Sequence, residues 1–190
     1  MRRSLIDVAA AAFFVAAALK VRSHQVGQTE EQVFRRFNDG PDWAFLPVWP
    51  VMQMGSLAAV GVATAIEARL RRPTALPVGL VGVAVWAGVK FTKAAVAGRG
   101  RPHRHLRDVH VRGEPQHGLG FPSGHAAVSL TIARIASVGR PPWARAALHA
   151  GSAATGMSRL YVGAHLPLDV AAGWAIGRLA GRVGRHFVRC

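Results

Sequence analysis

Ser158-Arg159-Leu160-Tyr161-Val162-Gly163-Ala164-His165-Leu166-Pro167-Leu168-Asp169 is the most informative stretch of this chain, because it gathers a guanidinium, an imidazole and a carboxylate. His165 and Asp169 are four residues apart, so a helix beginning here would place both side chains on one face. A carboxylate beside an imidazole fixes the tautomer of the ring and stabilises its positive charge, which activates the ring as a nucleophile or base. Arg159 adds a planar set of donors suited to phosphate oxygens.

Two further polar clusters lie upstream of this stretch. The nearer one is Pro122-Ser123-Gly124-His125, and the earlier one combines Lys93 with Arg101-Pro102. Proline is well placed in the first turn of a helix, so we expect a helix to open at Pro122. The amide groups of the next three residues would then face outward at a helix N-terminus, where the helix dipole also favours an anion.

In this order the three clusters resemble the motifs of the type 2 phosphatidic acid phosphatase superfamily. This family includes membrane lipid-phosphate phosphatases, soluble acid phosphatases and vanadium haloperoxidases. The resemblance covers residues 93–169, and the second and third clusters match the family pattern in full. The first cluster departs from it, because seven residues instead of six separate Lys93 from Arg101. If the extra residue lies inside a helix, it turns Lys93 by about 100°, and Lys90 is then the competing candidate for phosphate binding. The alternative is that the Gly98-Arg99-Gly100 loop accommodates the extra residue, because glycine allows unusual backbone angles.

The resemblance implies a role for each matching residue. His165 is the expected nucleophile, which forms a phosphohistidine, and Asp169 stabilises its charge. His125 is the expected general acid, a role that suits an imidazole near neutral pH. The resemblance also implies that no metal or other cofactor is needed. The expected phosphate-binding residues are Lys93, Arg101, Ser123, Gly124 and Arg159.

The composition favours apolar segments joined by basic loops. The chain has 190 residues, 51% of them hydrophobic, with a mean hydropathy of +0.21 and a net charge of +15. Nearly all the basic residues are arginines, which together with the many alanines is typical of a GC-rich bacterial genome. The arginines are spread along the loops without a compact basic helix or recognition motif, so we do not expect a nucleic-acid partner.

Six stretches approach the roughly 20 apolar residues that a membrane span requires. We therefore predict an all-α integral membrane bundle of six transmembrane helices that forms a single domain over residues 1–190. For the fourth and fifth stretches, which are short and contain Arg134 and His149, buried helices of a soluble protein are the alternative. The six predicted helices are 4–21, 43–66, 74–97, 122–138, 142–157 and 167–184.

The charge of the connecting segments predicts the orientation. With both termini in the cytoplasm every inner segment is basic, as the positive-inside rule requires. The outer segments are then 22–42, 99–121 and 158–166, and all three motif clusters meet at the outer face. The 99–121 loop is strongly basic and breaks the rule, and binding of an anion is one explanation. Within 22–42 we expect a short helix capped by Thr29, which lies along the interface or packs on the bundle.

Two groups of polar residues lie outside these motifs. Four histidines occur in the 99–121 loop, but no carboxylate or thiol completes a zinc set, so we expect contact with a head group rather than a metal. Asp7, Arg134 and His149 lie within predicted spans. Ion pairs across the bundle are one explanation for them, and for Arg134 extension toward the inner surface is the other.

The sequence thus predicts a metal-independent lipid-phosphate phosphatase in the bacterial cytoplasmic membrane, with its site at the outer face. Its candidate substrates are polyprenyl phosphates, diphosphates or phosphosugars, phosphatidylglycerophosphate and phosphatidic acid. The alternatives are a vanadate-dependent haloperoxidase-like enzyme and a lipid-binding or transport protein with a vestigial site. The oligomeric state is left open by the sequence.

Overall fold

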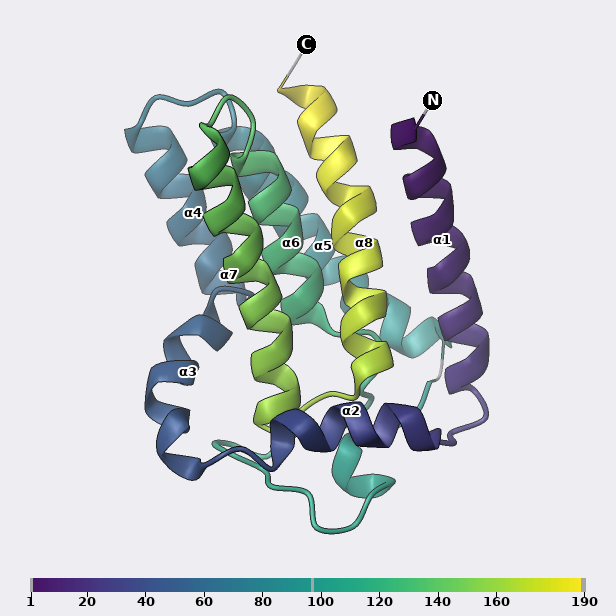
Figure 1. Ribbon diagram of the computed structural model, residues 1–190. Helices are drawn as coiled ribbons and strands as arrows, with labels where there is room; N and C mark the ends of the chain where they lie inside the picture. The colour runs from purple at the N-terminus through teal and green to yellow at the C-terminus, as the bar shows by residue number, and fades with distance from the viewer. Residues whose placement is uncertain (1, 97, 189–190) are drawn as a thin grey trace.

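The computed structural model describes residues 2–96 and 98–188, and in this part of the chain eight α-helices and two 3-10 helices occur without a β-strand (Figure 1). The fold class is therefore all-α. The helices are α1 (Arg2–Val21), α2 (Gln28–Asn38), η1 (Asp42–Ala44), α3 (Phe45–Gln53), α4 (Leu57–Arg69), α5 (Ala75–Val96), η2 (Pro102–Arg104), α6 (Gly124–Ala136), α7 (Pro142–Tyr161) and α8 (Pro167–Phe187).

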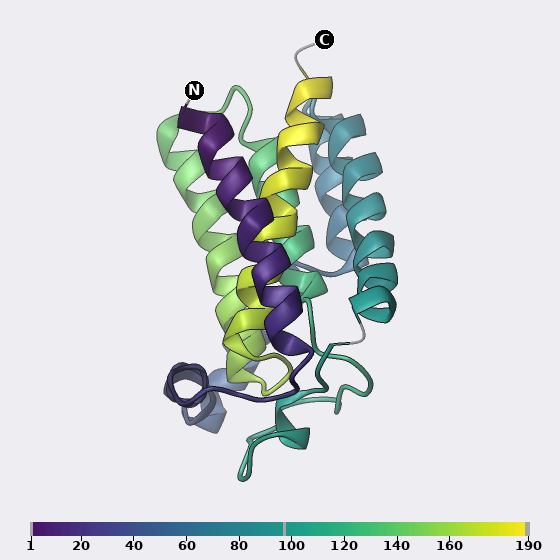
Figure 2. The ribbon, with the colours of Figure 1, turned by 90° about the vertical axis from the view of Figure 1, so that its right-hand side faces the viewer.

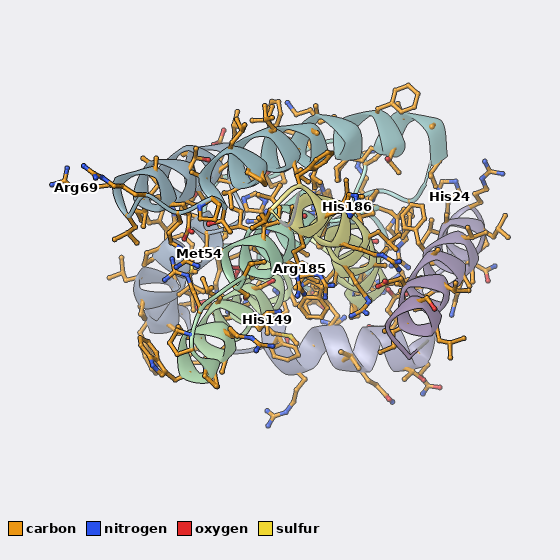
Figure 3. The ribbon with its side chains drawn as sticks, turned by 90° about the horizontal axis from the view of Figure 1, so that it is seen from above. His24, Met54, Arg69, His149, Arg185 and His186 are labelled. Atoms are coloured by element: carbon orange, nitrogen blue, oxygen red, sulfur yellow. The ribbon has the colours of Figure 1, made fainter. Side chains whose placement is uncertain are left out.

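The long helices form a bundle with two different ends. At one end α2 lies across the bundle beside the segment 98–123, and at the other end lie both ends of the chain (Figures 1 and 2). Viewed along the bundle, α8 lies between α1 on one side and α6 and α7 on the other (Figure 3). The helix ends that carry the three motif clusters are all at the α2 end.

A stripe of glycines on α8 brings that helix against α6. A Cβ atom at Gly173 would lie 2.4 Å from the carbonyl oxygen of Ser123, and one at Gly177 would lie 2.5 Å from that of Ala127. Small residues of this kind allow backbones to approach in lipid, where packing rather than the hydrophobic effect drives association. This close contact also places the first turns of α6 and α8 side by side.

The predicted single helix 43–66 is wrong, because the chain breaks there into α3 and α4, which meet at 59°. At the break, a Cβ atom on Gly55 would lie 2.3 Å from the carbonyl oxygen of His125. Ser56 then caps α4, since its side chain accepts a hydrogen bond from the amide of Ala59 at 3.2 Å. The chain turns here so that glycine backbone can lie directly against the first turn of α6.

The predicted number of spans exceeds the number that length and apolar character alone support. Within the described residues only α1 and α5 meet both requirements, and a third span results if the bent pair α3–α4 is counted as one. The 13 residues of α6 are about 20 Å long, against a hydrocarbon core of about 30 Å. The helices α7 and α8 are long enough but carry several polar residues, so six spans stay a prediction.

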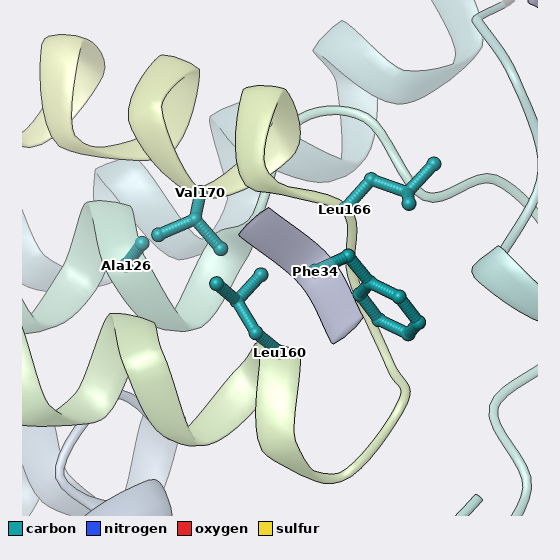
Figure 4. Packing of buried hydrophobic residues seen from close by; sticks show 5 residues of the cluster. All are labelled: Phe34, Ala126, Leu160, Leu166 and Val170. Atoms are coloured by element: carbon teal, nitrogen blue, oxygen red, sulfur yellow. The ribbon is translucent and has the colours of Figure 1, made fainter. Parts of the chain in front are cut away.

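The short helix α2 packs on the bundle rather than standing apart from it. Phe34 is fully buried among Ala126, Leu160, Leu166 and Val170, which belong to the ends of α6, α7 and α8 (Figure 4). The predicted cap by Thr29 is wrong, because Thr29 lies inside the helix and the capping residue is Gly27, without a side-chain hydrogen bond. Of the two arrangements considered, packing on the bundle is the one found.

The charged residues within the bundle form ion pairs in the half away from α2. Asp7 of α1 forms an ion pair with Arg178, whose Nε lies 2.9 Å from Oδ1, and accepts a hydrogen bond from Arg182 Nη1 at 2.5 Å, so the predicted pairing across the bundle is found for Asp7. The side chain of Arg134 lies against Gly181 of α8, and its buried Nε has no hydrogen-bond partner. His149 is exposed, and its Nδ1 lies 2.8 Å from the carbonyl oxygen of Arg145 in the same helix.

Candidate active site

The residues of the three motif clusters meet at the α2 end of the bundle. Lys93 is on the last turn of α5, and Arg101 lies in the following loop. Arg159 is on the last turn of α7, because that helix continues to Tyr161 and does not end at residue 157 as predicted. The others stand at or near the first turns of α6 and α8, and they are Ser123, Gly124, His125, His165 and Asp169.

His165 is held by the backbone of α7 and not by a helix of its own. Its amide donates to the carbonyl of Arg159 at 3.2 Å, as does the amide of Ala164 at 3.1 Å. These bonds fold the segment 162–166 back over the end of α7 and leave the imidazole only 2% exposed. The prediction that His165 and Asp169 share one helical face is wrong, since α8 begins only at Pro167.

His165 and Asp169 nevertheless lie next to each other. Nδ1 of His165 is 3.6 Å from Oδ2 of Asp169, and that same oxygen accepts a hydrogen bond from the amide of Leu166 at 2.9 Å. Asp169 thus caps the first turn of α8 while its carboxylate faces the imidazole. This arrangement favours the tautomer that carries its proton on Nδ1.

Arg101 lies on the opposite side of the imidazole. Its Nη1 donates to the carbonyl of Ala164 at 2.9 Å and is 2.9 Å from Nε2 of His165. Because a guanidinium can only donate, Nε2 accepts, which again requires a neutral ring protonated on Nδ1. Burial lowers the pKa of His165 well below its usual range, and the positive charges of Arg101, Lys93 and Arg159, with that of His125 when protonated, lower this pKa further.

Of the two candidate lysines, Lys93 is the one directed at the motif residues. Its Nζ donates to the carbonyls of Leu119 and Gly120 at 3.0 and 2.9 Å. Lys90 instead places its Nζ 3.6 Å from the ring centroid of Trp86. The helix α5 ends at Val96, so the extra residue of the first cluster falls in the loop and does not rotate Lys93.

The first turn of α6 differs from the prediction in two respects, because the helix does not open at Pro122 and one of the three amides does not face outward. The helix begins at Gly124, and Ser123 is its capping residue, whose side chain accepts from the amide of Ala126 at 3.5 Å. The amide of Ser123 does not face outward, because it donates to the carbonyl of Asp169 at 2.9 Å. This bond ties the starts of α6 and α8 together beside the imidazole.

A buried ion-pair network that was not predicted from the sequence lies behind Asp169. Arg99 is fully buried; its Nη1 donates to Oε2 of Glu30 at 2.7 Å, and its Nη2 donates to Oε1 of Glu30 and, at 3.2 Å, to Oδ1 of Asp169. Oε1 of Glu30 also accepts from the amide of Leu168 at 2.9 Å. One feature of the sequence points to Arg99, because it is one of the seven residues between Lys93 and Arg101 where six are usual.

The basic 99–121 loop is partly neutralised by the acidic segment 22–42. Besides the pair between Arg99 and Glu30, Arg112 Nε donates to Asp42 at 2.8 Å, and its other nitrogens donate to backbone carbonyls of residues 38, 40 and 161. Arginines of this loop therefore have structural partners. Arg99 and Arg112 therefore do not need an anion to balance their charge, and anion binding by the rest of the loop stays a prediction.

Two hollows lie near the cluster. A pocket of about 290 Å³ lies between α3 and the 103–116 segment, and it is lined by Trp49, Gln53, His103 and Arg159 among others. An open apolar groove of about 650 Å³ runs between α5 and α8 with Phe14 of α1 at its side. Among the described residues, no three His, Cys, Asp or Glu side chains are grouped to hold a metal ion, and this includes the histidines of the 99–121 loop.

The chain is similar to one protein family and to two solved structures. Residues 8–189 match the PAP2 superfamily. The crystal structure of Aquifex aeolicus LpxE has a TM-score of 0.73 with 25% identity, over 80% of this chain and 92% of that chain. A transmembrane PAP2 type phosphatidylglycerolphosphate phosphatase from Bacillus subtilis has a TM-score of 0.72 with 22% identity, over 95% of this chain and 94% of that chain. No curated protein matches the sequence. The resemblance inferred from the three motif clusters is therefore confirmed, and the chain belongs to the PAP2 superfamily.

Proposed function

We propose that this protein is a membrane phosphatase that removes phosphate from a lipid phosphomonoester or diphosphate through a phosphohistidine at His165. The observation that carries the proposal is the setting of this imidazole, with Asp169 3.6 Å from Nδ1 and Arg101 2.9 Å from Nε2. A buried neutral imidazole with a carboxylate behind it and cations in front of it suits attack on a phosphoryl group. Membership of the PAP2 superfamily supports the same reaction class.

The reaction has two steps. Nε2 of His165 attacks the phosphorus in line, and the bond to phosphorus forms as the bond to the lipid oxygen breaks. His125 gives its proton to that leaving oxygen, while Asp169 stabilises the positive charge on the His165 ring. A water molecule then attacks the phosphohistidine and passes its proton to His125, and the bond between phosphorus and nitrogen breaks to release phosphate.

The phosphoryl oxygens are held by cations and by the start of α6. When substrate enters, the guanidinium of Arg101 turns from Nε2 of His165 toward these oxygens, with Lys93 and Arg159 on the other sides. The hydroxyl of Ser123 and the amide of Gly124 supply the remaining donors at the helix N-terminus. Phosphoryl transfer depends mainly on positioning and charge stabilisation, so we propose that these groups act without a metal.

The apolar groove between α5 and α8 supports a lipid as substrate. Its lining includes Val89 and Thr92, and Thr92 is the residue before Lys93. A hydrocarbon chain in this groove would therefore lie along α5, the helix that carries Lys93 on its last turn. The candidates are polyprenyl phosphates, diphosphates and phosphosugars, phosphatidylglycerophosphate and phosphatidic acid. We place the site at the outer face of a bacterial cytoplasmic membrane, with both termini inside, in accordance with the basic inner segments.

Release of phosphate from a panel of these lipids in EDTA tests the proposal. Protein in detergent should release phosphate mainly from one class, and His165→Ala should lose this activity while still binding the lipid. His149→Ala is the matched control, because His149 is exposed and belongs to no motif. Retained activity in His165→Ala would contradict the nucleophile, and loss of activity in EDTA that added metal restores would contradict metal independence.

Two other outcomes separate the alternative functions. Halide oxidation by peroxide that depends on added vanadate would support the haloperoxidase-like reading. Binding of lipid phosphates without release of phosphate from any of them would support a lipid-binding or transport protein. Either result would replace the phosphatase proposal.

A further inference from the structure

Arg99 is the largest side chain of the described residues that is buried almost completely, and the reaction proposed above gives it no part. A buried guanidinium is costly unless its donors are paired. Here the pairing is with two carboxylates, those of Glu30 on α2 and Asp169 on α8. The three groups together carry one negative charge, which lies directly behind the imidazole of His165.

Arg99 and the amide of Leu166 each hold one oxygen of the Asp169 carboxylate. Oδ1 accepts from Arg99 Nη2 at 3.2 Å, and Oδ2 accepts from the amide of Leu166 at 2.9 Å, so the carboxylate plane cannot turn away from the ring. Glu30 in turn accepts from Arg99 and from the amide of Leu168 at 2.9 Å. Arg99 and Glu30 thus join α2, the loop after α5 and the first turn of α8 at this carboxylate.

The unusual spacing of the first cluster provides the place for Arg99. The loop between the end of α5 and Arg101 contains Gly98 and Gly100 on either side of Arg99. A Cβ atom on Gly100 would lie 2.8 Å from the side chain of Arg104, so the chain is tightly folded there. In this loop Arg99 faces Asp169 while Lys93 and Arg101 both keep their positions at the motif cluster.

We propose that Arg99 and Glu30 are positioning residues for catalysis, which hold Asp169 against Nδ1 of His165 and set the net charge behind the imidazole. This inference rests on the proposed phosphatase function. The pair touches neither substrate nor the reacting atoms, and it acts only through Asp169. It therefore affects the rate of the chemical step rather than the binding of lipid.

The charges of Arg99 and Glu30 predict the direction in which the pH dependence of kcat should shift, and a purely structural role would predict no such shift. The groups that face His165 are Asp169 on α8, Lys93 on α5, His125 on α6, Arg159 on α7 and Arg101 in the loop. Removal of Arg99 adds net negative charge behind the ring and favours its protonated form, so the acid limb of kcat against pH should move to higher pH. Removal of Glu30 should leave this limb in place or move it to lower pH.

The experiment compares Arg99→Gln, Arg99→Lys and Glu30→Gln with the unchanged protein on the best lipid substrate. For Arg99→Gln we expect kcat to fall by about 10- to 100-fold with KM changed less than about threefold. Arg99→Lys keeps the charge but lacks the planar set of donors, so it should retain more activity than the glutamine variant and leave the acid limb unmoved. Wild-type kcat and an unmoved acid limb in Arg99→Gln would overturn the proposal.

Controls separate positioning from loss of the fold. Glu31→Gln and Arg36→Gln change the same residue types on α2, where Glu31 pairs with Arg35 at the surface and Arg36 is exposed, and both should keep wild-type kinetics. The double variant Arg99→Met with Glu30→Met removes both members of the pair and leaves Asp169 with its hydrogen bond from the amide of Leu166, and thermal unfolding in detergent establishes whether it is folded. If it is folded and keeps the wild-type kcat, the pair has no positioning role.

A second readout does not depend on phosphatase activity. In protein carrying ¹⁵N-histidine, the ring nitrogens of His165 report the tautomer, assigned by comparison with His165→Gln. The unchanged protein should show the proton on Nδ1, and the variants should keep this tautomer because Arg101 still donates to Nε2. The same nitrogens give the titration midpoint of the ring, which should move to higher pH in Arg99→Gln because Arg99 no longer offsets the carboxylates behind the ring. If no lipid releases phosphate, the proposed function fails, and an unmoved midpoint in Arg99→Gln separately overturns the inference about Arg99 and Glu30.

Discussion

Nη1 of Arg101 lies 2.9 Å from Nε2 of His165, so a cation covers the ring nitrogen proposed to attack phosphorus. The same Nη1 donates to the carbonyl of Ala164, which fixes the guanidinium beside the ring. In the absence of substrate this contact keeps Nε2 unprotonated, because a guanidinium offers only donors. The cation that would bind the phosphate therefore also prepares the nucleophile.

Replacement of Arg101 should impair the reaction strongly. Arg101→Gln removes a charge that would stabilise the phosphoryl oxygens, and we expect kcat/KM to fall by about 100- to 1,000-fold. Arg101→Lys should recover only part of the loss, since an ammonium cannot contact two acceptors in one plane. Initial rates on the preferred lipid measure both values. A fall of less than about threefold, within the range of a surface variant, would show that Arg101 is not part of the site.

The protonation of His165 can be followed directly. Burial lowers the pKa of His165 well below its usual range, which is about 6.5. Because this pKa is lowered, the ring stays neutral down to a lower pH than the ring of an ordinary exposed histidine. The ¹⁵N shifts of His165 should therefore show a neutral ring at pH 6. A midpoint near 6.5 for His165 would contradict this expectation.

Gly55 should tolerate no side chain. A Cβ atom at this position would lie 2.6 Å from Cα of His125, so Gly55→Ala should displace the first turn of α6 and lower stability by about 1–3 kcal/mol. Loss of activity should accompany the loss of stability, because His125 moves. Gly61→Ala is the control, since nothing lies within 4 Å of its Cβ position in α4. Thermal unfolding and kcat in detergent give both comparisons, and equal behaviour of the two variants would refute the contact.

The ion pairs of Asp7 should matter for stability and not for the reaction. Asp7→Asn leaves Arg178 and Arg182 without their carboxylate, and because Arg182 is more than half exposed we expect a loss of only about 1–3 kcal/mol. In a chain of this size Tm falls by about 2–4 °C for each kcal/mol. The kcat of the folded variant should equal that of the wild type. Asp39→Asn, at an exposed carboxylate, should change neither quantity, and a lower kcat in Asp7→Asn would indicate coupling along the bundle.

The sequence predicted the clustering of motif residues better than it predicted their local structure. Short motifs at the ends of long apolar segments converge once the segments pack as a bundle, and this follows from topology alone. The helical pairing of His165 with Asp169 was wrong, because bonds from residues 164 and 165 to the carbonyl of Arg159 keep the segment out of α8. These bonds depend on tertiary folding, which spacing along the chain does not report.

Other features depend on contacts between distant segments. At the break in the predicted helix 43–66, Gly55 packs against His125, 70 residues later in the chain. The pairing of Glu30 with Arg99 likewise joins residues 69 positions apart. A single sequence shows an unremarkable acid on α2 and an arginine in a glycine loop, and only the packing of α2 across the bundle brings them together.

The first residues of α1 and the last residues of α8 lie on the side of the bundle opposite the motif residues (Figure 1). The 21 residues of α8 separate the two ends by about 31 Å. A fluorescent protein or an affinity tag joined to either terminus would therefore lie far from the motif residues. Such fusions also test the proposed orientation, in which a reporter that fluoresces only in the cytoplasm is bright at both termini.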